Sequence, residues 1–361
     1  MTTKERWLAA LKLEPVDRLP FWPKLDAAYP RAQEPPFREM GNGALHAWIG
    51  ADPHDWTGPC IKELRRHTSV QSISDHNLRI TTFNAPGGSA RLVLRFDEAS
   101  QSAHPIEFPA KSLEDIKLLT AFHEDCSVEL DPDALEEARE QAGRIGQSAI
   151  IGVGIGISPL MDWVQYLAGI ENAHVLLADH RGEVEALFDV MHRLLVRKAE
   201  IICETTPADM VYMIENTSTT LISPQQFRRY CLRHIGEYAR TAQRAGRPMV
   251  LHMCGKLKRL LSDLATLPVA AFEAFTSPTV GDTTLLDGRI GCADKCLIGG
   301  TNAALWIRPA NTIIAQIERD LAPLPHHRGI VLTSAGVMPP LCQPETIRQV
   351  CDWVKSHPVR N

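Results

Sequence analysis

The segment Leu251-His252-Met253-Cys254-Gly255 contains the pair of side chains best suited to chemistry. The apolar run before His252 is typical of a strand, and Gly255 ends it. Because side chains alternate along a strand, His252 and Cys254 should point to the same side. An imidazole and a thiol converging there suit zinc. A buried histidine and cysteine of an ordinary core would have the same spacing, so both interpretations stay open at this point.

Two other apolar segments also place polar groups at the end of an expected strand. Residues 269–275 contain one carboxylate, Glu273, and an unpaired carboxylate in such a strand is costly. A metal, a buried base or a substrate contact would explain it, and an exposed position at the strand end is the alternative. His252, Cys254 and Glu273 could share one ion and leave an open coordination position. Glu215 and Asn216 follow residues 210–214 and are candidates for orienting a substrate, with helix capping by Thr217 nearby as the alternative.

Glycine-rich segments follow two further strands. Gly152-Val153-Gly154-Ile155-Gly156 differs in spacing from the dinucleotide-binding fingerprint. We interpret it as a loop where Gly154 and Gly156 let a ligand approach the main chain. Asn302, in Gly299-Gly300-Thr301-Asn302, is a similar candidate for cofactor binding. Cys292 and Cys296 lack the second pair that a structural zinc site requires.

These residues must be positioned by an alternation of strands and helices that begins near residue 149. Short apolar strands are expected at 149–153, 210–214, 248–252, 269–275, 296–300 and 329–333, with an early one at 18–22. Amphipathic stretches between them favour a parallel sheet covered by helices. Seven strands and a suspected eighth predict an α/β fold, a (β/α)8 TIM barrel, with a doubly wound open sheet as the alternative. Residues 78–96 predict a β-hairpin, within an insertion at about 76–110 of a single domain spanning 1–361.

The bulk properties narrow the class of protein. The chain has 361 residues, 44% of them hydrophobic and 22% charged, with a formal net charge of -5. There is no basic stripe, so no nucleic-acid partner is expected. Nine cysteines, an odd number at irregular spacing, favour reduced thiols in the cytoplasm. The sequence contains neither a signal-peptide pattern nor a membrane-spanning apolar run, and a homodimer is compatible with its features.

Three motifs spread over the chain resemble the uroporphyrinogen decarboxylase superfamily. They are Pro15-Val16-Asp17-Arg18-Leu19-Pro20-Phe21-Trp22, His252-Met253-Cys254-Gly255 and the proline-rich segment 338–347. The resemblance implies a (β/α)8 barrel and two functional branches, cofactor-free decarboxylases and zinc methyltransferases. The decarboxylases' R-Q-A-G-R-Y motif is absent, since residues 23–29 read Pro-Lys-Leu-Asp-Ala-Ala-Tyr, and their late G-H-G is absent at 335–337. Porphyrinogen carboxylates need such arginines, so porphyrinogen decarboxylation is disfavoured.

The H-x-C-G element resembles the zinc ligands of the methyltransferase branch. That branch implies transfer of a methyl group from a methylated corrinoid protein to a small-molecule acceptor, a thiol or tetrahydrofolate. The branch's later cysteine ligand is missing near Gly336, so Glu273 is the better third ligand, with Cys342 as a further candidate. With a folate acceptor, Glu215 or Asp282 would manage the proton at the amine.

Methylcobalamin would come from a separate small corrinoid-binding protein, because this chain has no D-x-H-x-x-G corrinoid motif. Two alternatives to methyl transfer remain. One is a metal-free, decarboxylase-like lyase acting on a tetrapyrrole or another carboxylate. The other is a non-catalytic accessory protein that binds a corrinoid or tetrapyrrole.

Overall fold

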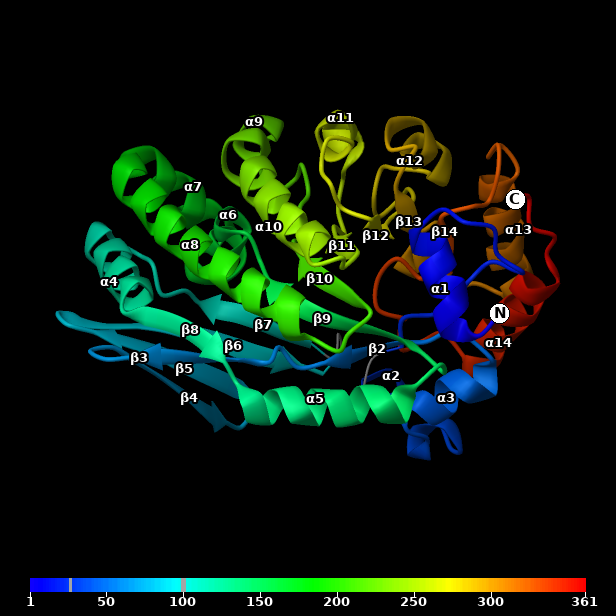
Figure 1. The fold of residues 1–361 in the computed structure, drawn as a ribbon, viewed down its shortest axis with the longest axis horizontal. Coiled ribbons are helices and arrows are strands. Elements are labelled where there is room, and N and C mark those ends of the chain that lie inside the picture. The colour runs from blue at the N-terminus through cyan, green and yellow to red at the C-terminus, as the bar shows by residue number, and fades with distance from the viewer. Residues whose placement is uncertain (26–27, 99–101) are drawn as a thin grey trace.

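The computed structural model describes residues 1–25, 28–98 and 102–361. Parts of the 23–29 segment and of the insertion expected at 76–110 therefore lie outside the described residues. The main sheet has eight parallel strands in the order β1-β14-β13-β12-β11-β10-β9-β2 (Figure 1). The strands are β1 (Phe21–Trp22), β2 (His54–Thr57), β9 (Ile150–Gly156), β10 (Met210–Ile214), β11 (Met249–His252), β12 (Ala271–Phe275), β13 (Cys296–Gly299) and β14 (Ile330–Thr333). The sheet curls nearly into a closed barrel, which confirms the (β/α)8 prediction, and the doubly wound alternative is wrong.

Most barrel strands are buried on both faces, as expected for parallel strands covered by helices, whereas Asp55 and Trp56 of β2 are exposed. One set of side chains fills the barrel interior, and the alternate set packs against the surrounding helices. Val250, Ala271 and Tyr212 belong to the interior cluster, whereas Leu251 and Phe272 belong to the outer core. The two-residue period of the strands therefore decides which side chains can reach the mouth of the barrel.

Helices surround the barrel and close one end of it. Helix α1 (Thr3–Leu11) starts with a capping box at Thr2 and places Trp7 and Leu11 against the barrel interior. The longest helix of the described chain is α8 (Arg181–Thr205). The other helices include α2 (Ala28–Arg31), α3 (Asn42–Ile49), α6 (Pro159–Asp162), α7 (Ile170–Asp179), α9 (Pro224–Gln226), α10 (Arg233–Arg244), α11 (Leu261–Leu264), α12 (Leu285–Gly291), α13 (Ala310–Leu321) and α14 (Pro344–Ser356).

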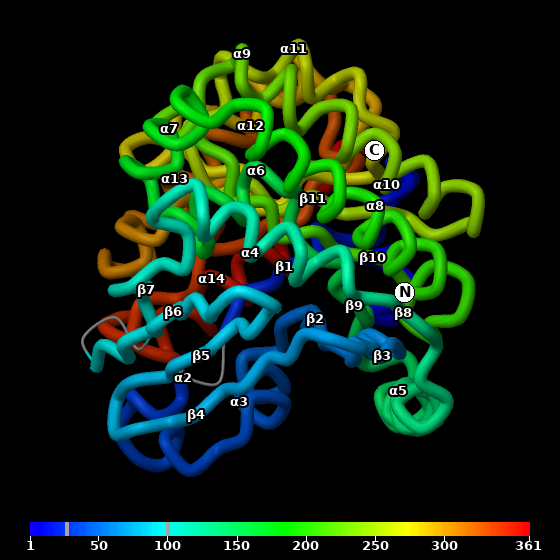
Figure 2. Tube along the Cα trace, turned by 90° about the vertical axis from the view of Figure 1, so that its left-hand side faces the viewer, coloured from blue at the N-terminus to red at the C-terminus, as the bar shows by residue number. Residues whose placement is uncertain are grey.

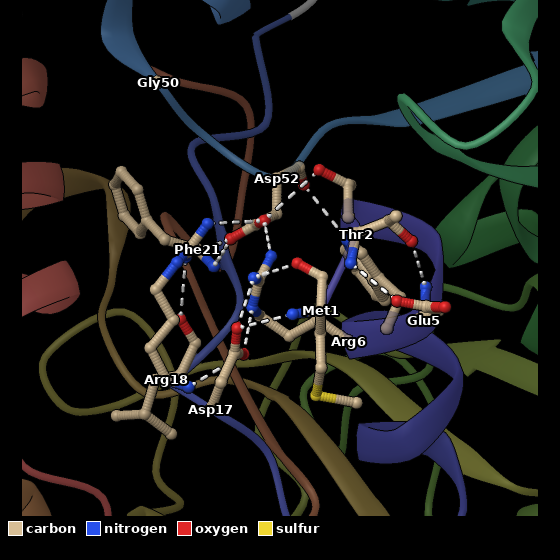
Figure 3. Close-up of polar contacts among 12 residues, drawn as sticks. Met1, Thr2, Glu5, Arg6, Asp17, Arg18, Phe21, Gly50 and Asp52 are labelled. Carbon is tan, nitrogen blue, oxygen red and sulfur yellow. Dashed lines mark hydrogen bonds and ion pairs between the residues drawn. The ribbon is translucent and has the colours of Figure 1, made fainter.

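The seam between β1 and β2 is held by a buried charge cluster (Figure 3). The carboxylate of Asp52 is fully buried and accepts hydrogen bonds from Arg6 at 2.6 Å and from Arg18 at 2.8 Å. It also accepts one from the backbone N–H of Phe21 at 3.1 Å, while the N–H of Asp52 donates to the carbonyl of Phe21 at 2.7 Å. β1 and β2 stand at the two ends of the strand order and have no backbone pairing with each other in the described sheet. Asp52 joins them instead.

An insertion between β2 and β9 forms a separate layer beside the barrel. Figure 1 shows its strands on the left of the molecule and both termini on the right, and Figure 2 shows the same layer from the side. Its core is a four-stranded antiparallel sheet rather than only the predicted hairpin, which is β5–β6. The inserted elements are β3 (Ile61–Arg65), β4 (Ser69–Asp75), β5 (Leu78–Ala85), β6 (Gly88–Asp97), β7 (Ser102–Glu107), α4 (Leu113–Glu124), β8 (Cys126–Leu130) and α5 (Pro132–Ile145). Cys126 and Val128 of β8 pack on Ile201 of α8, which fixes the insertion against the barrel.

In the described part of the chain, no helix is both long enough and apolar enough to cross a membrane.

Candidate active site

Four polar side chains gather at the mouth of the barrel because of strand alternation. On β11, β12 and β10, the interior residues Val250, Ala271 and Met210 are each followed two positions later by a polar residue. Those residues are His252, Glu273 and Tyr212. The fourth is Lys24, which follows β1, a strand on the opposite side of the barrel from β11. His252 and Glu273 are direct neighbours in the register of β11 and β12. The carboxyl ends of parallel barrel strands are the usual location of an active site.

Glu273 is the centre of a tight hydrogen-bond network. Its carboxylate is fully buried, contacts Nδ1 of His252 through one oxygen and accepts a hydrogen bond from Nζ of Lys24 at 2.8 Å through the other. The hydroxyl of Tyr212 donates to the oxygen that faces His252. Nζ of Lys24 also lies 3.4 Å from Nδ1 of His252. The carboxylate is therefore compensated by a cation and by two further polar groups, as a buried charge requires.

The charges of this network act on one another. Burial favours a neutral Glu273, but Lys24 and His252 outweigh it and hold the pKa of this carboxyl well below its usual range. Burial lowers the pKa of His252, but the adjacent Glu273 carboxylate more than compensates, so this pKa is raised. Burial and Glu273 together raise the pKa of Tyr212 well above its ordinary value. Glu273 is thus a stable anion, and Tyr212 remains a hydrogen-bond donor.

Cys254 lies just beyond the network and is exposed. Its thiol donates to Oδ1 of Asn216 at 3.3 Å, and the Asn216 amide donates to Gln165 at 2.7 Å. Partial burial would raise the pKa of Cys254, but its hydrogen bond to His252 and the charges of His252 and Lys24 lower it. The structure therefore brings His252, Cys254, Glu273 and Asn216 together, and His252 and Lys24 make the Cys254 thiol more acidic than an ordinary cysteine.

The donor types suit zinc, but they are not arranged as a preformed centre. Across the described ranges, no three His, Cys, Asp or Glu side chains are grouped in the way that a bound ion requires. His252 and Glu273 contact each other, and the ammonium of Lys24 fills the cation position beside both. Cys342 does not join them. Its thiol is buried in the outer core, where burial raises its pKa to about 12, and it faces the carbonyl of Gln343.

Glu215 faces away from the barrel interior because it follows β10 with the opposite parity to Tyr212. It is fully buried and accepts hydrogen bonds from the N–H of Ser158, at 2.9 Å, and from its hydroxyl. Burial raises the pKa of Glu215 to about 7, against the opposing effect of Ser158. The backbone N–H groups of Glu215 and Asn216 both donate to the carbonyl of His252. Glu215 therefore fixes the loop that carries Asn216 and does not face the cluster around Glu273.

Two other candidates hold loops at the same end of the barrel. Asp282 accepts hydrogen bonds from the N–H groups of Leu257 at 2.7 Å and Lys258 at 3.0 Å, which shapes the loop after β11. Asn302 donates to Ser277 at 3.1 Å and to the carbonyl of Pro278 at 2.9 Å. Both side chains have hydrogen-bond partners within the loops. Gly154 and Gly156, in contrast, line an open cavity at the barrel mouth, next to Tyr212.

Lys24 and Tyr212 are the site residues that sequence reasoning missed. Tyr212 had a signal in the sequence, because it alternates with Met210 on a strand that ends at the barrel mouth. Lys24 directly follows the first strand, but only closure of the barrel places it against β11 and β12. Both residues contact Glu273, so the carboxylate singled out in the sequence is the group that organises the site.

Comparison with known proteins agrees with this fold. The chain is similar to a methyltransferase from Methanosarcina mazei, with 18% identity over 99% of this chain and 98% of that chain and a TM-score of 0.59. No curated protein matches the chain. The family model described as uroporphyrinogen decarboxylase matches residues 96–357, which include His252, Cys254 and Glu273. The chain therefore belongs to the uroporphyrinogen decarboxylase family.

Proposed function

We propose that this protein is a methyltransferase that moves a methyl group from a methylated corrinoid protein to a thiol or to tetrahydrofolate at a zinc site. The observation that carries the proposal is the meeting of His252, Cys254 and Glu273 at the barrel mouth. They offer one nitrogen, one sulfur and one oxygen ligand, the set that zinc accepts, and three protein ligands leave a position for an acceptor. The methyltransferase from Methanosarcina mazei is consistent with this class but shares only the fold.

His252, Cys254 and Glu273 would hold the ion, which when bound makes a thiol acceptor more acidic and so more nucleophilic at neutral pH. Three other side chains would position these ligands and control access to them. Tyr212 donates to Glu273 and fixes the orientation of the carboxylate. Asn216 holds the sulfur of Cys254 in place from the neighbouring loop. Lys24 must move away from Glu273 before a second cation can enter, because it occupies that position now.

One observation favours a second candidate, a metal-free lyase of the same family. The ammonium of Lys24 already neutralises Glu273, so the pair is electrostatically complete without a metal. A fixed ammonium beside a histidine could bind the carboxylate of a substrate and protonate a developing carbanion. This candidate predicts release of carbon dioxide from a porphyrinogen or another carboxylate, with no need for zinc.

The test is a methyl-transfer assay with free methylcobalamin as donor and 2-mercaptoethanol or tetrahydrofolate as acceptor. The zinc-supplemented protein should retain about one zinc per chain after dialysis, as a single three-ligand site implies, and should demethylate the cobalamin. His252→Ala should lose both properties, whereas His67→Ala, an exposed histidine of the insertion, should keep them. Absence of stoichiometric zinc together with absence of transfer to either acceptor would overturn the proposal, and carbon dioxide release would favour the lyase.

A further inference from the structure

A cavity lies beside the site. Tyr212 connects the two, because it lines the cavity and also contacts Glu273. The volume of the cavity is about 570 Å³, which lies within the range of small-molecule sites. It extends from the barrel mouth over β9 toward β3. The walls are mostly apolar and aromatic: Ile61, Ile155, Tyr166, Ile202, Tyr212 and Ile214.

The floor of this cavity is main chain. Gly154 shares a strand face with Ile150, which belongs to the barrel interior. A bulge turns Gly156 to the other face, where it pairs with Met213 and lies against Leu195 of α8. A Cβ atom built on Gly154 would meet no atom within 4 Å, so the space above it is open. Because Gly154 has no side chain, a planar ring can approach the main chain closely at this point, with the aromatic rings of Tyr166 and Tyr212 at the cavity wall.

The far end of the cavity is polar but carries no surplus charge among its described residues. Glu63 pairs with Lys198 and accepts a hydrogen bond from Arg65 at 2.9 Å. Both cations are therefore engaged, and they lower the pKa of Glu63 to about 2 against the effect of burial. A porphyrinogen or a sulfonated thiol would need free cations here for its acidic groups. This end of the cavity favours an uncharged ligand instead.

A smaller cavity of about 270 Å³ continues beyond this pair and shares Gly156, Glu63 and Lys198 with the larger one. Its further polar lining residues are Arg65, Asp162 and His123. Nε2 of His123 is buried without a hydrogen-bond partner within the described structure. Burial, Arg65 and Lys198 lower the pKa of His123 to about 4, so its ring is neutral near pH 7. These groups can exchange hydrogen bonds with neutral polar substituents of a ring.

We infer that the glycine-floored cavity, lined by Gly154, Gly156 and Tyr212, binds the uncharged planar ring of a methyl-transfer substrate. Tyr212 connects the cavity to the site, because its hydroxyl donates to Glu273. The inference rests on the proposed methyl transfer and makes it narrower, since it favours a ring-bearing substrate over a small aliphatic thiol. Two sources carry such a ring. One is tetrahydrofolate as acceptor, whose pterin ring would enter the cavity while its glutamate carboxylates stay in solvent, and the other is an aryl methyl ether as the origin of the methyl group.

The experiment measures binding of tetrahydrofolate and of 1,2-dimethoxybenzene by isothermal titration calorimetry, without corrinoid or zinc. Gly154→Val should weaken binding of the recognised ring at least tenfold, because valine fills open space and suits a strand. Gly154→Ala should weaken it less. Gly143→Ala is the matched control, since its Cβ also meets open space but on α5, away from the cavity. Thermal melting of each variant checks that the fold is intact.

Binding of either compound that is lost in Gly154→Val supports the inference and identifies the source of the ring. If neither compound binds the wild type, or if Gly154→Val binds as well as Gly143→Ala, the inference is overturned. The readout is independent of methyl transfer. Ring binding without any transfer would leave the cavity assigned and reject the proposed function, whereas transfer to a thiol without ring binding would do the reverse.

Discussion

At the scale of single residues, Lys24 decides how the site can receive a metal. Its ammonium is 2.8 Å from Glu273 and 3.4 Å from His252, so a zinc ion and Lys24 compete for the same ligands. We predict that Lys24→Met binds zinc at least tenfold more tightly than the wild type, in a competition titration with a chromophoric chelator. Lys12→Met, at an exposed lysine after α1, should leave the affinity unchanged. Equal affinities for all three proteins would show that Lys24 does not compete.

Ionisation of the buried Glu215 should make the stability of the protein depend on pH. Its pKa in the folded state is about 7, above the ordinary 4.5, because burial favours the protonated form. The folded state therefore holds the proton more tightly, and this contribution to stability is complete below about pH 4.5 and is lost as the pH rises through about 7. Glu215→Gln cannot ionise. The unfolding free energy of the wild type relative to this variant should fall by about 3 kcal/mol between pH 4.5 and pH 8, measured by urea denaturation. A constant difference across this range would contradict the prediction.

At the scale of elements, the strands that carry the site were the most predictable part of the fold. The bounds of β10 are those expected from its apolar run, and β11 and β14 begin one residue later than expected and end as expected. Strand β2, His54-Asp55-Trp56-Thr57, was missed because its sequence is polar and short, in a region rich in proline and glycine. It is a strand because β9 offers it a pairing edge, which no local pattern of residues could reveal.

The contrast between local sequence pattern and long-range pairing also explains which site residues could be predicted. His252, Glu273 and Asn216 follow recognisable strands, so their positions could be derived from alternation alone. Lys24 and β1 lie across the barrel from β11 in the strand order, and only the closed sheet brings them together. Cys342 is close to Gly336 in sequence, but the segment between them leads into the outer core rather than back to the mouth. Short sequence separation is therefore a weaker guide here than position at the end of a parallel strand.

The seam between β1 and β2 depends on Asp52, and we predict that Asp52→Asn is strongly destabilising. The change removes the carboxylate that pairs with Arg18 and leaves Arg6 with Asp17 as its anionic partner, and breaking a buried ion pair usually costs about 3–5 kcal/mol. Chemical denaturation should show this loss. Glu34→Gln removes an ion pair with Arg38 in which both side chains are exposed, by 86% and 52%, and it should hardly change the stability. Similar losses in both variants would mean that the cluster does not hold the seam.

At the scale of the whole molecule, the cysteines report on both the site and the cooperativity of the fold. All nine are free thiols, and eight are buried, whereas Cys254 alone among them is exposed. Thiolate formation at Cys254 is favoured by His252, so this thiol should react fastest. We predict that Ellman's reagent modifies one thiol in the folded protein and none in Cys254→Ser, with all nine accessible only after denaturation. Zinc added beforehand should slow the reaction of the wild type, since a bound thiolate is a poorer nucleophile.

The buried thiols extend this prediction to the single-domain interpretation. Cys60 and Cys126 lie in or next to the insertion, and Cys296 and Cys351 lie in the barrel and its last helix. Because β8 packs on α8, the insertion should not unfold before the barrel. Thiol labelling along a urea gradient, read by mass spectrometry of peptides, should therefore give one midpoint for all four cysteines. If Cys60 and Cys126 became reactive at a lower urea concentration than Cys296, the insertion would be a separate folding unit, and the cavity between β3 and β9 would open without loss of the barrel.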